Sequence, residues 1–305
     1  MKILISGSSG FVGTALVEAL GSEGHTVCRL ARPQSAPAGG QPAVAVRWDP
    51  LAGELDSAAA QGAQAVVNLA GASIAEGRWN ERRKRILRSS RVDTTRQLVS
   101  ALARLSRPPQ VFVSASAIGY YGDRGDEALT EQSAPGTDFL ATLARDWEAE
   151  AGRAAQFGAR VVTLRFGLIL ARHGGALPRM LLPFRLGLGG RMGSGKQWTS
   201  WLTLEEVIRI LRYALATPAL RGPVNAVAPH PVRNAEFTAL LGSVLHRPTL
   251  FPAPAMALRL ALGEMAEALL LSSQRVLPRK LGEAGYSFQH PELRTSLVAL
   301  LGRAG

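Results

Sequence analysis

The sequence predicts an α/β fold, a doubly wound parallel sheet followed by a smaller, mostly helical C-terminal region. Two observations predict it. Short apolar runs alternate with amphipathic helix patterns over the first half of the chain, and a glycine-rich turn follows the first run. Helices between the strands would cover both faces of the sheet. We expect buried strands at 2–6, 25–31, 44–48, 65–70, 110–116 and 160–167.

The regular alternation of strand and helix patterns ends after about residue 170. We expect residues 1–170 to form the sheet domain and residues 171–305 to form a substrate-side and tail region, with 200–230 returning to the sheet domain. Within the second part, 182–198 is rich in glycine and predicts a long, mobile loop. Residues 203–216 predict an amphipathic helix with a capping-box spacing at its start.

Composition limits the classes of partner. Hydrophobic residues make up 47% of the chain and charged residues 19%, which is typical of a globular protein, and no apolar run has the length or purity of a membrane span. The net charge of +12 concentrates at 78–91, but no aromatic platform accompanies that segment, so nucleic acid is an unlikely partner. The same central helices could support a homodimer. The single cysteine, Cys28, excludes an internal disulfide and fits a reducing, cytoplasmic compartment.

The opening strand leads into a turn, GSSGFVG, that predicts a phosphate-binding loop. Gly7 allows a tight turn, Gly10 allows the backbone to approach a pyrophosphate, and Gly13 allows the following helix to pack on the sheet. Ser9 lies within the same turn. The helix that begins near Phe11 would direct its free N–H groups at the phosphates. The strand–turn–helix context therefore predicts dinucleotide binding on a Rossmann-type fold.

The end of the second strand predicts which dinucleotide is bound. NAD sites commonly place a carboxylate there to bind the ribose 2′-hydroxyl. Here the strand ends in Ala31 and Arg32. A guanidinium can pair with a 2′-phosphate, and no carboxylate is present to repel it, so we expect NADP(H).

The motifs together resemble the extended short-chain dehydrogenase/reductases, which include the nucleotide-sugar epimerases. Within that group the chain most resembles the atypical "epimerase family protein" branch, whose C-terminal tail has no assigned role. The resemblance covers nearly the whole chain. It is carried by GSSGFVG, NLAGA (68–72), IAEGRW (74–79), SRV (90–92), SASAIGYYG (114–122), LRFGLIL (164–170) and the tail 276–293.

The resemblance also implies where the cofactor would lie. The glycine turn would contact the pyrophosphate, and strand ends would form the crevice for the rest of the molecule. In chain order, the resemblance places Gly7, Gly10, Phe11 and Val12 on the pyrophosphate, Arg32 on the adenosine phosphate, Asp49 near the adenine, Leu69, Ala70 and Gly71 along the ribose, and Ser114 to Ser116 at the nicotinamide edge.

The catalytic pair of that family does not appear in this chain. Relatives carry a Tyr and, four residues later, a Lys, whose positive charge lowers the pKa of the phenol. The corresponding positions here are Leu140 and Ala144, which cannot transfer a proton. Ser116 persists and could hold a substrate carbonyl, or it could simply bind backbone. Tyr121 is the best remaining candidate for a general acid, and no metal-ligand spacing is present.

Two functions follow. The first is an NADP(H)-binding oxidoreductase, or a nucleotide-sugar-epimerase-like protein, with an unknown substrate. The second is a non-catalytic NADPH-binding sensor or scaffold, which the resemblance links to cell division. Loss of both catalytic side chains beside an intact glycine turn favours the second. The first remains open because the cofactor itself carries the hydride chemistry and the protein has only to position it.

Overall fold

The structure is a computed structural model and describes residues 1–32 and 44–302. Its centre is an eight-stranded sheet in the order β12-β8-β6-β5-β1-β2-β3-β4, in which every neighbouring pair is parallel except β3 with β4. All six strands expected from the sequence are confirmed, with ends displaced by a few residues at most. The strands are β1 Lys2–Ser6, β2 Thr26–Ala31, β3 Val44–Asp49, β4 Glu54–Leu55, β5 Ala65–Asn68, β6 Val111–Ala117, β8 Arg160–Phe166 and β12 Gly222–Ala226.

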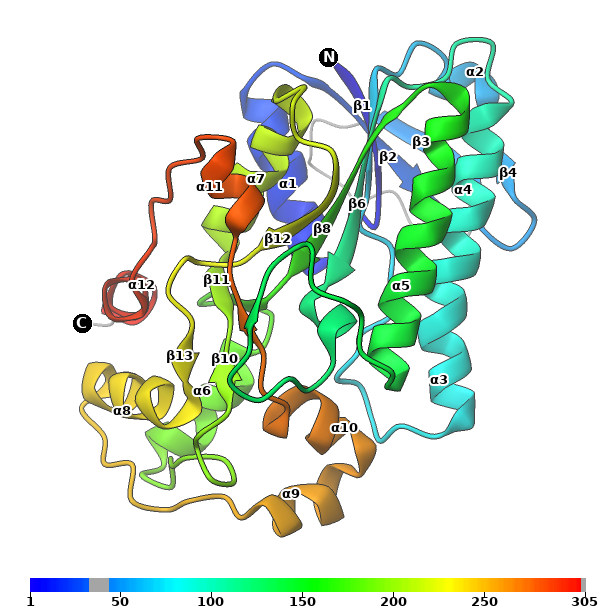
Figure 1. Ribbon diagram of the computed structural model, residues 1–305. Coiled ribbons are helices and arrows are strands. Elements are labelled where there is room, and N and C mark those ends of the chain that lie inside the picture. The colour runs from blue at the N-terminus through cyan, green and yellow to red at the C-terminus, as the bar shows by residue number, and fades with distance from the viewer. Residues whose placement is uncertain (33–43, 303–305) are drawn as a thin grey trace.

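Helices cover both faces of this sheet, as expected (Figure 1). One face packs against α1 (Phe11–Ser22) and α7 (Leu204–Ala216), and the other packs against α4 (Thr94–Ala103) and α5 (Phe139–Gly152). The strands are apolar on both sides because both sides are buried. The N-cap of helix α7 is Thr203, whose side chain accepts a hydrogen bond from the backbone N–H of Glu206, but the Glu206 carboxylate is directed to the tail and does not complete a capping box.

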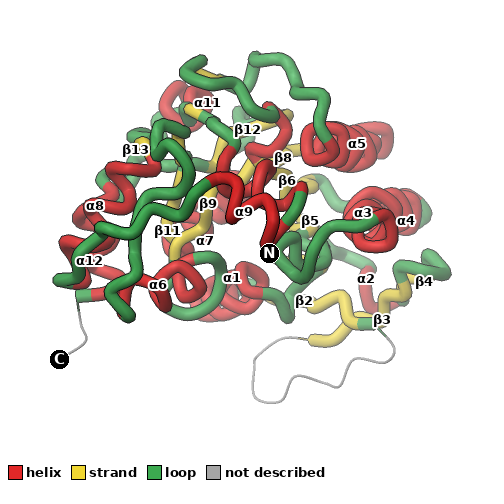
Figure 2. The backbone as a smooth tube through the Cα atoms, turned by 90° about the horizontal axis from the view of Figure 1, so that it is seen from below, coloured by secondary structure: helices red, strands yellow, loops and turns green. Residues whose placement is uncertain are grey.

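The order of the strands places the ligand crevice. From β1 the chain moves to β2 and β3 on one side, and β5, β6, β8 and β12 lie on the other side. Such a reversal opens a crevice at the carboxyl ends of the strands, here between β1 and β5. Viewed from that end, helix α9 (Ala255–Leu262) crosses in front of the central strands (Figure 2).

The remaining elements connect or follow these strands. Between the main strands lie α2 Ser57–Ala60, α3 Glu81–Arg88, the π-helical turn η1 Ser89–Asp93, the 3₁₀ turns η2 Ile118–Tyr121 and η3 Arg153–Phe157, and β7 Ala128–Leu129. The second half adds β9 Leu168–Leu170, α6 Leu177–Arg185, β10 Trp198–Thr199, β11 Trp201–Thr203, β13 Val232–Arg233 and α8 Asn234–Leu245. The tail forms α10 Glu264–Ala266, η4 Glu267–Leu271, β14 Arg275–Val276, α11 Arg279–Glu283 and α12 Leu293–Leu301.

The glycine-rich segment expected at 182–198 begins later than the sequence indicates. Helix α6 continues to Arg185 even though Pro183 lies inside it. Leu177, Leu181 and Phe184 of this helix are buried against α8 and α12, and that packing outweighs the helix-breaking tendency of the proline.

The most apolar stretch of the tail is broken at Gly263, whose φ of 64° ends α9 and starts α10 in a new direction. In the part of the chain that the structure describes, no helix has the length and apolar character needed to cross a membrane.

The tail is tied to the sheet domain by a buried carboxylate. Glu206 of α7 is fully buried and accepts hydrogen bonds from the Tyr286 hydroxyl and from the backbone N–H groups of Gln289 and His290. Its charge is also paired with Arg209 at 3.4 Å. The tail is therefore held to the sheet domain through hydrogen bonds to a charged group, which are stronger than those between neutral groups.

Candidate cofactor and active site

The glycine turn after β1 has the shape that a phosphate-binding loop needs. Gly7 has a φ of 75°, and a Cβ there would lie 2.7 Å from the backbone of Leu69. A Cβ on Gly13 would lie 2.1 Å from the carbonyl oxygen of Gly7. Side chains are thus excluded at both positions by backbone, as the sequence predicted.

Helix α1 presents an uncapped N-terminus to this turn. Its N-cap is Gly10, no side chain caps it, and its first turn contains no acidic residue. The first N–H groups of a helix have no partner within it, so here they are available to an anion. The ring of Phe11 packs against the loop that follows β9, where a Cβ on Gly174 would lie 2.6 Å from it.

Two predicted cofactor residues lie at the β2–β3 side of the crevice. Arg32 directly follows β2, is exposed, and forms no ion pair with any carboxylate of the described residues. Asp49 ends β3, and its Oδ1 accepts hydrogen bonds from the backbone N–H groups of Leu51 (2.9 Å) and Ala52 (3.3 Å). Asp49 therefore orders its own turn, and its position near the adenine stays a prediction.

On the other side of β1, the predicted ribose segment Leu69–Gly71 follows β5. The last residue of that strand, Asn68, belongs to a buried cluster of polar side chains. The Asn68 amide donates to Thr95 Oγ1 (2.8 Å) and to Ser114 Oγ (3.4 Å). Ser114 is fully buried, so its side chain faces this cluster and not the crevice. Any contact of Ser114 with a ligand would have to use its backbone.

Ser116 takes part in a buried ionic network that sequence reasoning missed. Its hydroxyl donates a 2.6 Å hydrogen bond to Oε1 of Glu148 on α5. Two nitrogens of Arg165 on β8 donate to the two oxygens of the same carboxylate, each at 2.7 Å. The Arg165 side chain is 2% exposed, and the bonds to Glu148 raise its pKa against the desolvation that lowers it. The pair is therefore ionic and rigid.

Tyr121 is enclosed by the same network. Its hydroxyl donates to Asn225 Oδ1 (2.6 Å) and accepts from Arg165 (2.9 Å), and the side chain is fully buried. Burial raises its pKa to about 12, although Arg165 acts in the opposite direction. A phenol with both hydrogen-bonding roles filled and no exposure is poorly placed to protonate a ligand in the crevice. This geometry argues against the general-acid role that the sequence suggested for Tyr121.

The positions expected to carry the Tyr and Lys are filled by apolar packing. Leu140 lies against Gly119, where a Cβ would be 3.2 Å from the leucine Cβ, and Ala144 is buried. Around them lies an apolar cluster that includes Trp79 and Trp147.

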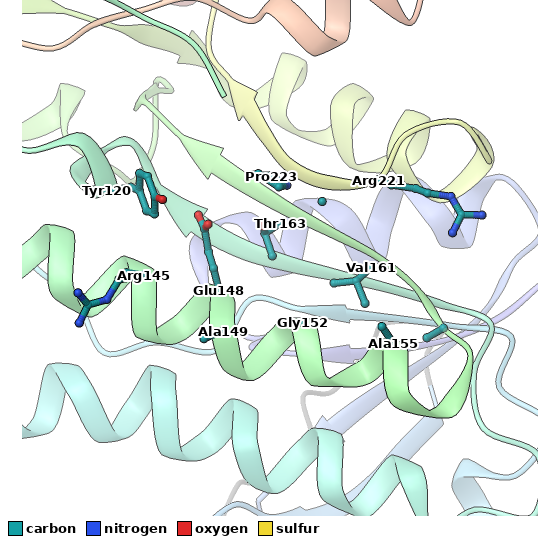
Figure 3. A pocket seen from close by; sticks show the side chains of 12 residues that line it. Tyr120, Arg145, Glu148, Ala149, Gly152, Ala155, Val161, Thr163, Arg221 and Pro223 are labelled. Atoms are coloured by element: carbon teal, nitrogen blue, oxygen red, sulfur yellow. The ribbon is translucent and has the colours of Figure 1, made fainter. Parts of the chain in front are cut away.

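Glu148 also lines a groove at the β12 edge of the sheet. The groove has a volume of roughly 500 Å³ and lies between α5 and the strands β8 and β12. Figure 3 shows Glu148 and Tyr120 at one end of it, with Thr163 on its floor, and the side chains of Arg145 and Arg221 at opposite ends. Glu148 thus connects Ser116 to a solvent-open surface.

The basic segment 78–91 is divided by the fold. Arg78 lies before α3, Arg88 pairs with Asp146 at 2.7 Å, and Arg83 turns inward to the carbonyl oxygen of Ser73. Several charges of this segment are therefore engaged within the protein and do not form one exposed surface. Among the described residues, no group of three or more His, Cys, Asp or Glu side chains is arranged to hold a metal ion.

Comparison with known proteins agrees with this geometry. The model of the NAD dependent epimerase/dehydratase family matches residues 3–226, which contain the eight-stranded sheet except its first residue, Lys2. The chain belongs to that family. A second model, described as a domain of unknown function (DUF1731), matches residues 253–300, so this family member also carries the tail that the sequence resemblance indicated.

Relatives of this epimerase-family chain span its full length. "Epimerase family protein MT2273" of Mycobacterium tuberculosis is 43% identical over 303 residues, covering 99% of this chain and 98% of the relative. The crystal structure of human epimerase family protein SDR39U1 (isoform2) with NADPH has a TM-score of 0.89 and 34% identity, covering 99% of this chain and 100% of the human one. A nucleoside-diphosphate sugar epimerase from Corynebacterium glutamicum has a TM-score of 0.80 and 35% identity, covering 99% of this chain and 58% of that one.

Two features of the site escaped sequence reasoning. Glu148 and Arg165 were read only as parts of a helix and a strand, although a charged residue at a buried strand position signals a partner elsewhere. Arg91 lies within the basic segment 78–91, where the sequence does not distinguish it from its exposed neighbours. In both cases the partner is distant in sequence.

Proposed function

We propose that this chain binds NADP(H) and uses it for hydride transfer to and from a carbonyl or alcohol carbon of a small molecule. The observation that carries the proposal is the pairing of an uncapped helix N-terminus with a turn that admits no side chains. The exposed Arg32 supports the phosphorylated cofactor, and the human relative was crystallised with NADPH.

Several residues would hold the cofactor. The turn at Gly7–Gly13 would bind the pyrophosphate, Arg32 the 2′-phosphate, and Leu69–Gly71 the nicotinamide half. NADPH supplies a hydride at C4 of its nicotinamide ring when it is bound. The protein's share of the chemistry is to bind the substrate and to hold its reacting oxygen.

We assign the placement of the substrate oxygen to Ser116, which Glu148 orients. Because the Ser116 hydroxyl donates its hydrogen bond to Glu148, its oxygen is free to accept a hydrogen bond from a substrate hydroxyl. On oxidation of that alcohol its hydroxyl proton would leave to water, while Ser116, oriented by the ion-paired Glu148, holds the substrate oxygen. Reduction would run the same transfers in reverse.

A second function, a non-catalytic NADPH sensor or scaffold, is favoured by one observation. The expected Tyr and Lys positions are apolar, and the phenol of Tyr121 is enclosed. Such a protein would bind the cofactor and turn nothing over.

One experiment separates the two. The protein is loaded with NADPH deuterated at the nicotinamide C4 and incubated with a metabolite extract, and the label is followed by mass spectrometry. Transfer to one metabolite in the parent, with strong loss in Ser116→Ala, supports the oxidoreductase. Label that stays on bound cofactor supports the sensor, and failure to bind NADPH contradicts both.

A further inference from the structure

Arg91 reaches from a helix irregularity into the edge of the crevice. It lies in η1, a π-helical turn between α3 and α4, and such turns re-aim side chains out of the normal helical register. Its guanidinium donates to the carbonyl oxygen of Ala72 (3.0 Å) and to that of Leu87 (3.3 Å). The N–H of Ala72 in turn donates to Ser90 Oγ (3.0 Å), so η1 holds both backbone groups of Ala72.

The guanidinium lies directly on Gly71. A Cβ on Gly71 would be 3.1 to 3.3 Å from three of its atoms, so glycine leaves the room that this side chain occupies. On another side, the ring of Trp147 lies 5.4 Å from the guanidinium carbon. The charged group is therefore held at one place between a backbone and an aromatic ring.

The charge of Arg91 is not neutralised within the described part of the chain. Its hydrogen-bond acceptors are backbone carbonyl oxygens, and no described carboxylate pairs with it. The other charged group close to it is Arg83, which has the same sign. Desolvation, and then the charge of Arg83, lower the pKa of Arg91 to about 10, so it is still a cation at neutral pH.

The strand order assigns this cation to one half of a dinucleotide. Arg32 follows β2, on one side of β1, whereas Gly71 follows β5, on the other side. A dinucleotide laid across the switch point has its adenosine half at Arg32 and its nicotinamide half at Gly71. This step rests on the proposed function: with NADP(H) bound across the switch point, Arg91 lies beside the nicotinamide half.

We propose that Arg91 binds the nicotinamide half of the cofactor and makes the site prefer NADPH to NADP⁺. The nicotinamide ring is neutral in NADPH and cationic in NADP⁺, so an unpaired guanidinium repels only the oxidised form. Two unit charges within about 8 Å at the effective dielectric of a protein surface shift a binding ratio roughly ten- to hundredfold.

The proposal is tested by isothermal titration calorimetry with NADPH, NADP⁺ and 2′,5′-ADP, which represents the adenosine half alone. We compare the parent with Arg91→Gln and Arg91→Lys. We expect R91Q to weaken NADPH binding several-fold, to lower the ratio of the NADP⁺ Kd to the NADPH Kd by about tenfold, and to leave 2′,5′-ADP unchanged. R91K, which keeps the charge, should keep most of the ratio.

A second variant distinguishes loss of the Arg91 charge at this place from a folding defect in R91Q. Gly71→Ala keeps every charge but pushes the guanidinium away, so it should also lower the ratio. An unchanged ratio in both R91Q and G71A overturns the proposal, and if R91Q no longer binds 2′,5′-ADP, G71A alone decides. A parent that binds neither NADPH nor 2′,5′-ADP overturns the proposed function instead.

Discussion

Arg165 and Glu148 form a two-pronged ion pair, with both bonds at 2.7 Å, across the space between β8 and α5. The same guanidinium stacks 3.4 Å from the centre of the Tyr120 ring and donates to the Tyr121 hydroxyl. Asn225, which accepts the hydrogen bond of the Tyr121 hydroxyl, donates in turn to the carbonyl oxygen of Leu277 in the tail. The buried Arg165 therefore links Ser116, through Glu148, to the tail.

This pair predicts an asymmetric effect on stability. Arg165→Met leaves a carboxylate with 13% exposure and no cation, and we expect a loss of about 3–5 kcal/mol in the free energy of unfolding. The double variant E148L/R165M removes both charges and should lose clearly less. Urea denaturation of the two variants and of Glu148→Leu measures the difference, and equal losses in R165M and the double variant would contradict it.

Arg32 predicts the cofactor preference. Arg32→Asp replaces the group that would pair with a 2′-phosphate by one that repels it and can bind a ribose hydroxyl. We expect the ratio of the NADH Kd to the NADPH Kd to fall by about tenfold or more in R32D. Arg107→Ala is the control, since this exposed arginine precedes β6 at the opposite end of the sheet. Unchanged affinities in R32D would exclude Arg32 from the site.

Two glycine-to-alanine substitutions are expected to affect NADPH binding and stability differently. In Gly13→Ala the new Cβ would lie 2.1 Å from the carbonyl oxygen of Gly7, so the turn must move, and we expect a fall in NADPH affinity of at least roughly tenfold. In Gly152→Ala, at the end of α5, the Cβ meets nothing within 4 Å. That change should be neutral or stabilise by up to about 1 kcal/mol. Calorimetric affinity and thermal denaturation check both, and full affinity in G13A would count against the phosphate-binding turn.

The buried phenol predicts how stability depends on alkaline pH. The pKa of Tyr121 is raised to about 12, above the value near 10 of an exposed tyrosine, so the folded state resists losing its proton. Its contribution is complete below pH 10 and is lost as the pH rises from about 10 to about 12, on the order of 2–3 kcal/mol. Tyr121→Phe should remove this slope while leaving NADPH affinity unchanged. Parallel stability curves of parent and variant between pH 10 and 12 would refute the assignment.

The sequence alone determined the sheet and the glycine turn of this protein. The strands at 2–6 and 65–70 are composed mostly of apolar residues, and the turn between Gly7 and Gly13 is specified by neighbours a few residues away. These are local patterns, so a linear reading captures them. The position of Arg32 was predictable for the same reason, because it follows from the end of one strand.

Only the tertiary structure decided what the charged and polar groups do. Tyr121 looked available in the sequence, and packing against Asn225 and Arg165 enclosed it. Arg91 looked like one exposed arginine among many until a π-helical turn laid it on Gly71. In each case the outcome depends on which distant backbone or side chain the fold brings within hydrogen-bonding distance, and a charge acquires its partner, or lacks one, only when the strands and helices are assembled.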